Sequence, residues 1–514
     1  MSDLLIGFQD VLNPATLIWV AIGVTLGYVL GALPGLGKAT GVAVCIPLTF
    51  YLGPVAALGM LIGIAKGSAA GSAVSAILLN TPGEPSSAPT ALDGYPLARQ
   101  GKAQKALKMG LFASVIGDFV STVILIALAA PLARYALLIG PVEICAILLF
   151  SLTFIGGLSG NSLIKGLIAG AMGVFFSTIG LEAETFVSRM TLGLLELEDG
   201  IALVPMAIGM LAVAEMAVQA GNVKVLDSEG ARITDGASRS DRVVLASEWR
   251  RCLPVIARGT LIGSVVGILP GLGASVGSFL SYGATKKASK TPEKYGTGMI
   301  EGVAAAESAD NAVVPSSLIP LFALGIPGSV IAAILIAAFI LHGLTPGPLM
   351  FQQQPRLVAD VYAAMLCASV ILLIVGYTGQ RLFAQVIKAP LRLIIPGVLL
   401  LCTVGAYMET SSVFSIYVML FFTVIGFFAR KLDFSFVTFL IGFVIGPNLE
   451  LSFRQSLQLL DHNAVNLAKH PIAVVFILLT VAVVWWIGRG KNPAAGGQVT
   501  RSSRATEKHV PTNS

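Results

Sequence analysis

Apolar stretches close to 20 residues long recur along this chain, and they limit its fold more than any other feature of the sequence. A stretch of this length can cross the hydrocarbon core of a bilayer as an α-helix. Only 12% of the 514 residues are charged, whereas a soluble domain carries about 25%. The sequence therefore predicts an all-α integral membrane protein with about ten to twelve transmembrane helices. Examples of the stretches are residues 15–33, 55–79, 109–130, 201–220, 329–342, 361–378, 412–429 and 471–488.

One seven-residue motif occurs twice. Residues 31–37 read GALPGLG and residues 267–273 read GILPGLG, so six of the seven positions are identical. A Ser-containing stretch of small residues follows each motif, and a second Pro-Gly pair comes after it, within LLNTPGEP in the first half and ALGIPGSV in the second. Recurrence of this kind is the sequence signature of internal duplication.

The duplication predicts four regions in the chain. Residues 1–220 form a first transmembrane repeat and residues 251–488 form a second. A polar cytoplasmic linker at 221–250 joins them, and a basic, disordered tail occupies 489–514. The first apolar segment lacks a convincing cleavage site and is expected to be a retained helix.

Lysine and arginine fall on different loops in the two halves. In the first half the basic residues lie at 99–108, after the second Pro-Gly pair, and in the second half they lie at 286–294, after the LPGLG motif. The matching regions, 339–348 and 50–58, contain no lysine or arginine. Because short basic loops stay in the cytoplasm, equivalent loops are predicted to lie on opposite sides of the membrane. The chain is thus expected to contain two inverted-topology repeats with broken or re-entrant segments.

The two PGLG sequences interrupt apolar segments and are candidates for anion binding. A helix that restarts after such a break directs free N–H groups and a positive dipole end toward the interruption. The alternative is a proline kink with tight helix packing; two copies at equivalent positions favour the binding role. The predicted substrate-binding residues are Pro34, Gly35, Gly37, Ser68, Asn80, Thr81, Pro270, Gly271, Gly273, Ser275 and Asn311.

Acidic and amide residues inside the second-half apolar region are candidates for ion coupling. Ionisable groups within a membrane usually mark an ion or substrate path, and hard cations prefer oxygen ligands. Glu307, Asp310 and Asn311 are predicted to serve this role, the alternative being interfacial carboxylates at a helix end. No metal is predicted beyond a bound sodium ion, and no other cofactor.

Four further residues have two interpretations each. Lys38 and Lys66 either pair with an anion or extend to the membrane interface. Asp118 is expected to be a hydrogen-bonded packing residue, and His342 a structural or interfacial one.

The sequence contains no enzyme signature. There is no nucleophile elbow, zinc-protease motif or P-loop, so an enzyme and built-in ATP drive are not expected. The net charge of +6 is concentrated in loops and the tail, as the positive-inside bias produces. It does not indicate a nucleic-acid partner.

Taken together, these segments resemble the large membrane subunit of the tripartite tricarboxylate transporters, over nearly the whole chain. Two positions depart from the family pattern: KGSAAGSA stands at 66–73, where the family commonly has a tyrosine- and glycine-rich stretch, and Asp310-Asn311 stands where two asparagines are frequent. The motifs that carry the resemblance are GALPGLG, SAILLNTPGEPSSAPTALDGYPLARQGKA, GILPGLGASVGSFLSY, ESADNAVVPSSLIPLFALGIPG and LHGLTPGPLMF.

The resemblance implies a three-part uptake system in the bacterial inner (plasma) membrane. Its other parts are a periplasmic substrate-binding protein and a small four-helix membrane subunit. The system takes up tricarboxylates or related carboxylate anions, driven by a sodium or proton gradient. The alternative is a stand-alone carboxylate carrier or channel that needs no binding protein.

Overall fold

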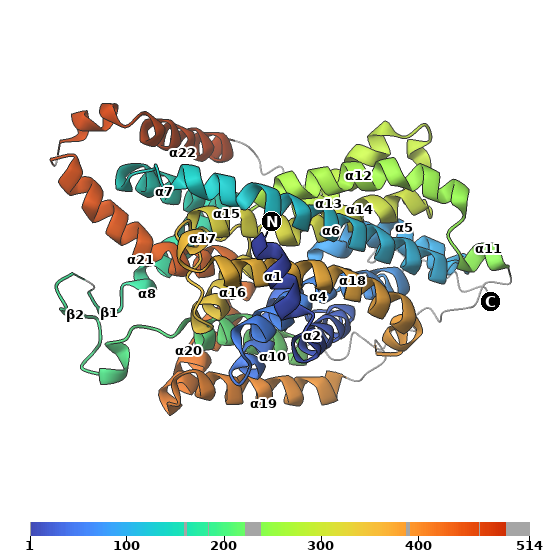
Figure 1. Ribbon diagram of the computed structural model, residues 1–514, viewed down its shortest axis with the longest axis horizontal. Helices are drawn as coiled ribbons and strands as arrows, with labels where there is room; N and C mark the ends of the chain where they lie inside the picture. Colours follow the sequence, from blue (N-terminus) through green and yellow to red (C-terminus); the bar gives the residue numbers. More distant parts are fainter. Residues whose placement is uncertain are drawn as a thin grey trace, which may run out of the picture.

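The chain is almost entirely helical in a computed structural model that describes residues 2–158, 162–182, 184–221, 238–386, 391–461 and 463–489. Figure 1 shows many of its longer helices running in similar directions across the molecule. Within the described residues, β structure is limited to one antiparallel hairpin, β1 (Gly180–Leu181) and β2 (Ser188–Arg189). The prediction of an all-α protein is confirmed.

Eight helices among the described residues are long and apolar enough to cross a membrane. One of them combines three consecutive elements: α9 (Leu203–Ala207), the π-helix η4 (Ile208–Val213) and α10 (Ala214–Gly221). The other seven are α2 (Pro14–Ala32), α4 (Pro54–Leu79), α6 (Ala103–Ala136), α12 (Ala246–Ile268), α18 (Pro355–Val386), α20 (Val413–Lys431) and α21 (Phe436–Leu459).

Six further apolar helices of the described chain accompany the eight candidate spans. Those of 15 residues or fewer are too short to cross a bilayer core of roughly 30 Å alone, so the number of crossings depends on how they combine. Glycine and proline break these apolar segments; α3 (Lys38–Cys45), for example, follows PGLG and continues only into η1 (Ile46–Thr49). The others are α7 (Pro141–Leu158), α8 (Leu163–Ser177), α16 (Val330–Leu341), α19 (Leu391–Thr410) and α22 (Pro471–Arg489).

The remaining elements connect these helices or line the interior. They are α1 (Ser2–Val11), η2 (Pro85–Ser87), α5 (Ala88–Arg99), η3 (Leu195–Leu197), α11 (Arg239–Arg242), α13 (Gly273–Ala288), η6 (Pro292–Lys294), α14 (Ile300–Ser316), α15 (Leu318–Leu324), α17 (Met350–Gln353) and η7 (Ala464–Lys469). Of the predicted linker, residues 222–237 lie outside the described residues, and α12 already begins at Ala246. Residues 490–514 of the predicted tail also lie outside them.

Helices α2 and α4 pack closely because glycine lines their contact. Gly23, Gly27 and Gly31 each face the backbone of α4, where a Cβ atom would collide with a carbonyl oxygen. Gly259, Gly263 and Gly267 face α14 from α12 with the same spacing. Small residues four apart let helix backbones approach closely in membranes. One LPGLG motif comes directly after α2 and the other directly after α12.

The two ends of the helix array are held by different loops. At one end, Gln100 Nε2 donates to the Thr297 carbonyl at 2.8 Å, and Lys105 Nζ lies 2.7 Å from Glu248 Oε1. Thr49 Oγ1 lies 3.0 Å from His342 Nε2. Helix α4 follows directly after the Thr49 loop and spans 26 residues, about 39 Å at 1.5 Å per residue. Gly94 of α5 faces Ile77, near the other end of α4. Region 99–108, which follows α5 and contacts Thr297, therefore lies away from the Thr49 loop, together with the loop that follows 286–294.

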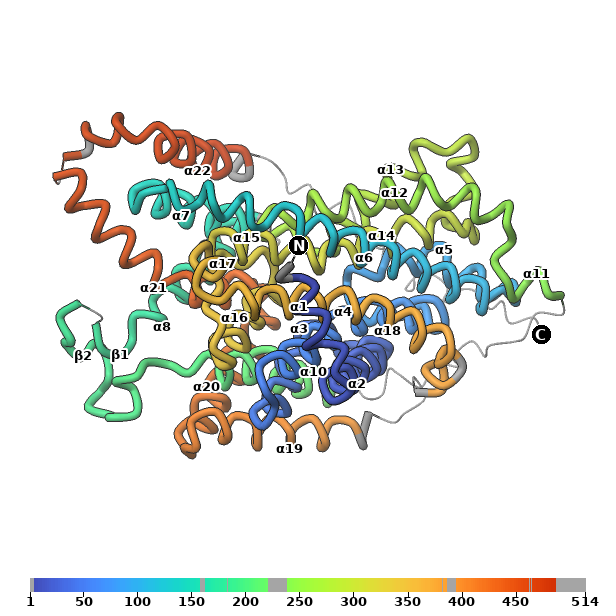
Figure 2. Tube along the Cα trace, in the orientation of Figure 1, coloured from blue at the N-terminus to red at the C-terminus, as the bar shows by residue number. Residues whose placement is uncertain are grey.

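Parts of the chain that are distant in sequence lie side by side. Figure 2 shows α1 crossing α18, and the two helices are joined by an ion pair between Arg356 and Asp10 at 2.9 Å. Helix α6 of the first half packs on α14 of the second, and α18 of the second half packs on α2 and α4 of the first. The halves are therefore interleaved.

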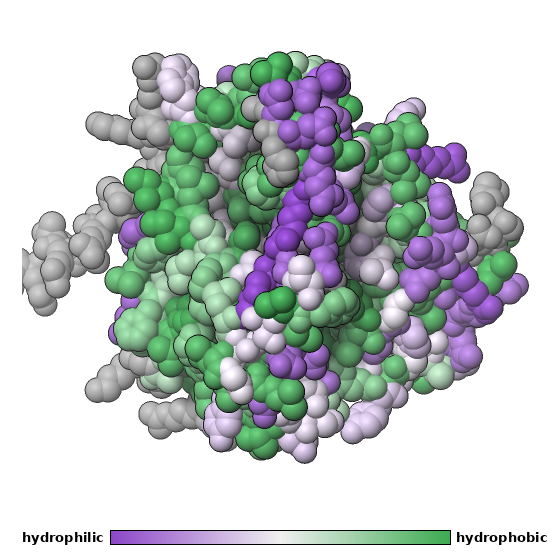
Figure 3. Space-filling view, turned by 90° about the vertical axis from the view of Figure 1, so that its left-hand side faces the viewer, coloured by the Kyte–Doolittle hydropathy of each residue, from purple (hydrophilic) through white to green (hydrophobic). Residues whose placement is uncertain are grey.

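Large apolar side chains are exposed on several outer helices. Figure 3 shows a face covered largely by hydrophobic residues and crossed by a band of hydrophilic ones. On α20, Tyr417, Phe421 and Phe428 are 62%, 54% and 53% exposed. Soluble monomers rarely expose contiguous apolar surface on this scale. With the eight candidate spans, this surface identifies a multi-pass membrane protein whose outer helices contact lipid.

Candidate functional site

The two LPGLG motifs fold into closely similar turns. Leu33 and Leu269 are extended, with φ of −84° and −83°, and end α2 and α12. The next glycines, Gly35 and Gly271, have φ of +82° and +88°, a region that side chains with a Cβ rarely adopt. Helix α3 then begins at Lys38 and α13 at Gly273. The two breaks match up to the first glycine and differ at the last one, since Gly37 has a φ of −69° and Gly273 a φ of +68°.

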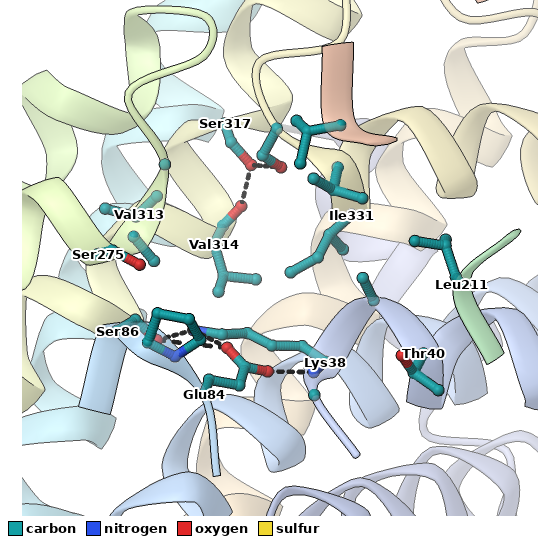
Figure 4. Close-up of a pocket in the computed structure, with 18 of the residues that line it drawn as sticks. Lys38, Thr40, Glu84, Ser86, Leu211, Ser275, Val313, Val314, Ser317 and Ile331 are labelled. Carbon is teal, nitrogen blue, oxygen red and sulfur yellow. Dashed lines mark hydrogen bonds and ion pairs between the residues drawn. The ribbon is translucent and has the colours of Figure 1, made fainter. Parts of the chain in front are cut away.

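Both turns line one cavity of about 790 Å³. Figure 4 shows Lys38 and Glu84 on one side of it, Ser317 and Ile331 on the other, and Leu211 projecting from the π-helix η4. The cavity also meets both Pro-Gly turns, through Pro82, Gly83 and Ser329. In the second half these turns touch directly, since the Gly271 N–H donates to the Gly328 carbonyl at 3.2 Å.

The structure brings five of the predicted substrate residues to this cavity: Gly35, Gly37, Gly271, Gly273 and Ser275. The other six do not line it. Pro34 and Pro270 lie within the turns, beside the lining glycines. Ser68 is fully buried in α4, and its hydroxyl has no hydrogen-bond partner among the described residues.

Asn80, Thr81 and Asn311 also lie away from the cavity lining. Asn80 ends α4 in a left-handed conformation with φ of +53°, and Thr81 Oγ1 donates to the Leu79 carbonyl at 3.3 Å. Asn311 is buried on α14, where its Nδ2 donates to the Glu307 carbonyl at 3.1 Å. In this conformation the Thr81 and Asn311 side chains have local partners, and Asn80 occupies the C-cap position of α4.

An ionic cluster occupies the start of α3. The Lys38 N–H donates to Glu84 Oε1. Lys38 Nζ lies 3.2 Å from Glu84 Oε2 and 2.6 Å from Asp310 Oδ1, and it donates to Ser86 Oγ at 3.2 Å. The side chains of Lys38, Glu84 and Asp310 are 4%, 12% and 1% exposed. Lys38 therefore pairs with carboxylates inside the protein and does not extend to an interface.

The N-terminus of α13 differs from that of α3. Among the described residues, no side chain caps it. Gly273 and Ser275 of its first turn line the cavity. A helix N-terminus favours anions through its N–H groups and dipole. Of the two helix starts, α3 already holds the protein's own carboxylate, Glu84, whereas the start of α13 is available to a ligand.

The sequence analysis did not single out the second cationic group of the cavity. Arg430, in the last turn of α20, pairs with Glu215 at 3.1 Å and donates to the carbonyls of Met210 and Leu211 at 3.0 and 3.2 Å. Its guanidinium also lies 4.7 Å from the Phe436 ring centroid. Both carbonyls belong to the π-helix η4, a distortion found frequently at functional sites.

Glu84 and Arg430 had weak sequence signals. Glu84 stands in the TPGEP segment, directly after the first Pro-Gly pair, so its position in a break was visible. Arg430 ends an apolar stretch, where an arginine ordinarily reaches the interface. Its acidic partner is 215 residues away in sequence. Only the folded chain shows that the two meet.

Glu307, one of the predicted ion-coupling residues, is fully buried. Its carboxylate accepts hydrogen bonds from Thr90 Oγ1 at 2.6 Å and Ser114 Oγ at 2.9 Å. Neither Glu307 nor Asn311 lines the cavity. Asp310 is connected to it through Lys38.

Lys66 and Asp118 form a separate buried ion pair. Lys66 Nζ lies 2.9 Å from Asp118 Oδ2 and donates to Ser369 Oγ at 3.0 Å and the Met365 carbonyl at 2.8 Å. These contacts join α4, α6 and α18. Lys66 neither reaches an interface nor faces the cavity, and Asp118 is held by hydrogen bonds, as expected. The contact between His342 and Thr49 fits a structural role for the histidine.

Comparisons with known proteins agree over most of the chain. A model of the "Tripartite tricarboxylate transporter TctA family" matches residues 17–441. An "Uncharacterized 52.8 kDa protein in TAR-I ttuC' 3'region" of Agrobacterium vitis is 36% identical over 485 residues, which cover 94% of this chain and 95% of the relative. An "Uncharacterized protein in TAR-II ttuC' 3'region" of the same organism is 34% identical over 222 residues, 43% of this chain and 92% of that protein. No solved structure matches the chain.

Proposed function

Because this chain belongs to the tripartite tricarboxylate transporter TctA family, a family of membrane transporters and not of enzymes, we propose that it takes up tricarboxylates or related carboxylate anions across the bacterial inner membrane. It acts as the large permease subunit. A periplasmic substrate-binding protein delivers the substrate, and a small four-helix membrane subunit completes the complex.

One observation carries this proposal: both LPGLG turns line the same cavity. An anion buried in a low-dielectric interior needs fixed donors. The first turn of α13 supplies such donors, and Lys38 and Arg430 place cationic groups, each paired with a carboxylate, at the same cavity. The substrate shell comprises Gly35, Gly37, Gly271, Gly273 and Ser275, with Pro34 and Pro270 shaping the turns. Rearrangement during transport would be needed to bring in Ser68, Asn80, Thr81 and Asn311.

A sodium or proton gradient drives the uptake. Glu307 and Asp310 are buried carboxylates one turn apart on α14, a helix that is buried along its length. Asn311 supplies a further oxygen, Oδ1, that has no partner among the described residues. Carboxylate and amide oxygens suit sodium, and buried carboxylates also accept protons.

The two halves are inverted-topology repeats. Three features support this: the positive φ of Gly35 and Gly271, the equal glycine spacing in α2 and α12, and the position of the loops. Region 99–108 lies with 286–299, whereas the Thr49 loop lies with His342. Equivalent loops are thus separated along the helices, as a two-fold axis in the membrane plane requires.

The test uses proteoliposomes that contain the chain and its small subunit, with the binding protein and labelled citrate outside. We expect citrate, or another carboxylate of a panel including malate, succinate and benzoate, to accumulate under a sodium or proton gradient. ATP without a gradient should give no accumulation. Equal uptake without the binding protein would instead indicate a stand-alone carrier, and accumulation with ATP alone would refute secondary transport.

A further inference from the structure

Among the described residues, each cationic side chain that lines the cavity is already paired with a carboxylate, so none is unpaired for an incoming anion. Lys38 and Arg430 are the two cationic groups among the described residues that line it, and Glu84 and Glu215 are the two carboxylates. Asp310 does not line the cavity but pairs with Lys38, which does. The described cluster therefore holds two cations against three carboxylates, and each cation is already paired. Adding a carboxylate to a buried site with excess negative charge is strongly unfavourable.

Glu84 occupies the donors that a substrate carboxylate would use. It accepts the Lys38 N–H at the start of α3 and also pairs with the Lys38 ammonium. Glu84 itself lines the cavity, so a ligand in the cavity can reach it. A substrate carboxylate has the same shape and charge as the glutamate group. The two anions therefore compete for the same amide and ammonium.

Asp310 has an unused oxygen in the same cluster. Its side chain is 1% exposed, and Oδ2 has no hydrogen-bond partner among the described residues. A buried oxygen without a partner is costly and calls for a proton, an ion or another ligand. Asp310 Oδ2 thus provides a place where a cation can enter the cluster without displacing an existing bond.

We propose that Lys38, Glu84 and Asp310 form a coupling switch, in which a substrate carboxylate replaces Glu84 on Lys38 while a monovalent cation binds between the released Glu84 carboxylate and Asp310. The inference rests on the proposed function and identifies the residues that link substrate to cation. The cation is a proton or a sodium ion, because both neutralise a carboxylate.

Charge balance makes substrate binding and cation binding depend on each other. Substrate without the cation would leave Glu84 charged and buried without its counter-charge, and the cation without substrate would neutralise a carboxylate that pairs with Lys38. Only the joint event leaves the net charge of the buried cluster unchanged. Each ligand therefore raises the affinity for the other by the same factor, as linkage requires. Such mutual dependence is what a symporter needs to avoid leaking ions.

The central test is Glu84→Gln, compared with Glu248→Gln as a matched control. Glu248 also pairs with a lysine, Lys105, and accepts a helix N-terminal N–H, that of Leu245, but it does not line the cavity. Proteoliposomes of the whole complex, with binding protein, are assayed for gradient-driven accumulation and for exchange at equal concentrations. The probe is the carboxylate of the panel that wild type accumulates. Sodium is varied at constant pH in one arm, and pH is varied without sodium in the other.

Wild type and Glu248→Gln should lose exchange when the coupling cation is withdrawn, by about tenfold or more. The exchange rate of Glu84→Gln should no longer depend on the concentration of the coupling cation. Its gradient-driven accumulation of substrate should fall by a similar factor. If Glu84→Gln keeps the cation dependence of wild type, the switch is refuted. If wild type accumulates no carboxylate under either gradient, it is the proposed function that fails.

Two further measurements test the switch even if Glu84→Gln does not fold. Asp310→Asn should shift the cation dependence in the same direction. In the wild-type complex in detergent, binding of the probe should be accompanied by uptake of protons or sodium, measured with a pH indicator or by sodium titration. Binding with neither cation taken up overturns the inference.

Discussion

Lys66 and Asp118 form an ion pair, Nζ to Oδ2 at 2.9 Å, between side chains that are 0% and 1% exposed. The pair lies outside the cavity lining and joins α4 to α6, while Ser369 and Met365 extend its contacts to α18. This buried ion pair therefore joins helices of both halves. Removing it tests how much it contributes to the stability of the interleaved halves.

Lys66→Met should destabilise the protein by about 3–5 kcal/mol, because it leaves Asp118 charged, buried and without its cation. The double variant Lys66→Met with Asp118→Leu should recover much of that loss. Thermal unfolding of the purified complex and abundance in the membrane measure both. Arg356→Gln is the control: it breaks a pair whose arginine is 71% exposed and should cost about 0–1 kcal/mol. Equal effects of the two single variants would contradict the structural role of Lys66.

Gly271→Ala should abolish or strongly reduce uptake. A Cβ at Gly271 would collide with Ile155, and its φ of +88° is strained for alanine, at a cost on the order of 1–3 kcal/mol. The measured quantity is uptake per unit of complex in the membrane. Gly283→Ala is the control, since a Cβ there meets nothing within 4 Å. Wild-type uptake by Gly271→Ala would show that the turn tolerates a side chain and is not a tightly built site.

Arg430→Gln should lower uptake by roughly tenfold or more, since three charge-assisted contacts are lost, with Glu215 and two carbonyls of the π-helix. The double variant Arg430→Gln with Glu215→Gln should recover part of the loss if charge balance dominates. Uptake at saturating and limiting substrate separates binding from turnover. The neighbouring Lys431→Gln, on an exposed side chain, should behave as wild type; similar loss in both would argue for a general defect of α20.

Asp93→Asn should loosen the loop that precedes α14. Asp93 is fully buried and accepts the N–H groups of Gly296, Gly298 and Met299 together with the Tyr282 hydroxyl. Hydrogen bonds to a charged group are each worth about 1.5–3 kcal/mol.

Limited proteolysis with trypsin measures this effect, because Lys290 and Lys294 lie in this loop, and Lys286 and Lys287 lie in the last turn of α13 just before it. Cleavage should be faster in Asp93→Asn than in wild type. Glu293→Gln, an exposed change on the same loop, should leave the rate unaltered. Unchanged cleavage in Asp93→Asn would mean that other contacts hold the loop.

The membrane class and the broken helices could be predicted because they depend on local chemistry. A long apolar stretch needs a bilayer wherever its neighbours lie, and the glycine of LPGLG permits the positive φ of Gly35 and Gly271 without tertiary help. The candidate site was predicted in part for the same reason. The glycines of both turns reached the cavity, whereas Ser68 and Asn311, chosen only as polar residues in apolar segments, are buried elsewhere.

The amino-acid sequence was enough to identify a helical membrane transporter of one family, with two similar breaks in its helices. Which charges meet is visible only in the folded chain: Lys38 pairs with Asp310, 272 residues away, and Arg430 pairs with Glu215. Apolar periodicity and turn chemistry act over a few neighbouring residues. A buried charge, in contrast, requires a partner that any part of the chain can supply, so its identity depends on how the two halves interleave.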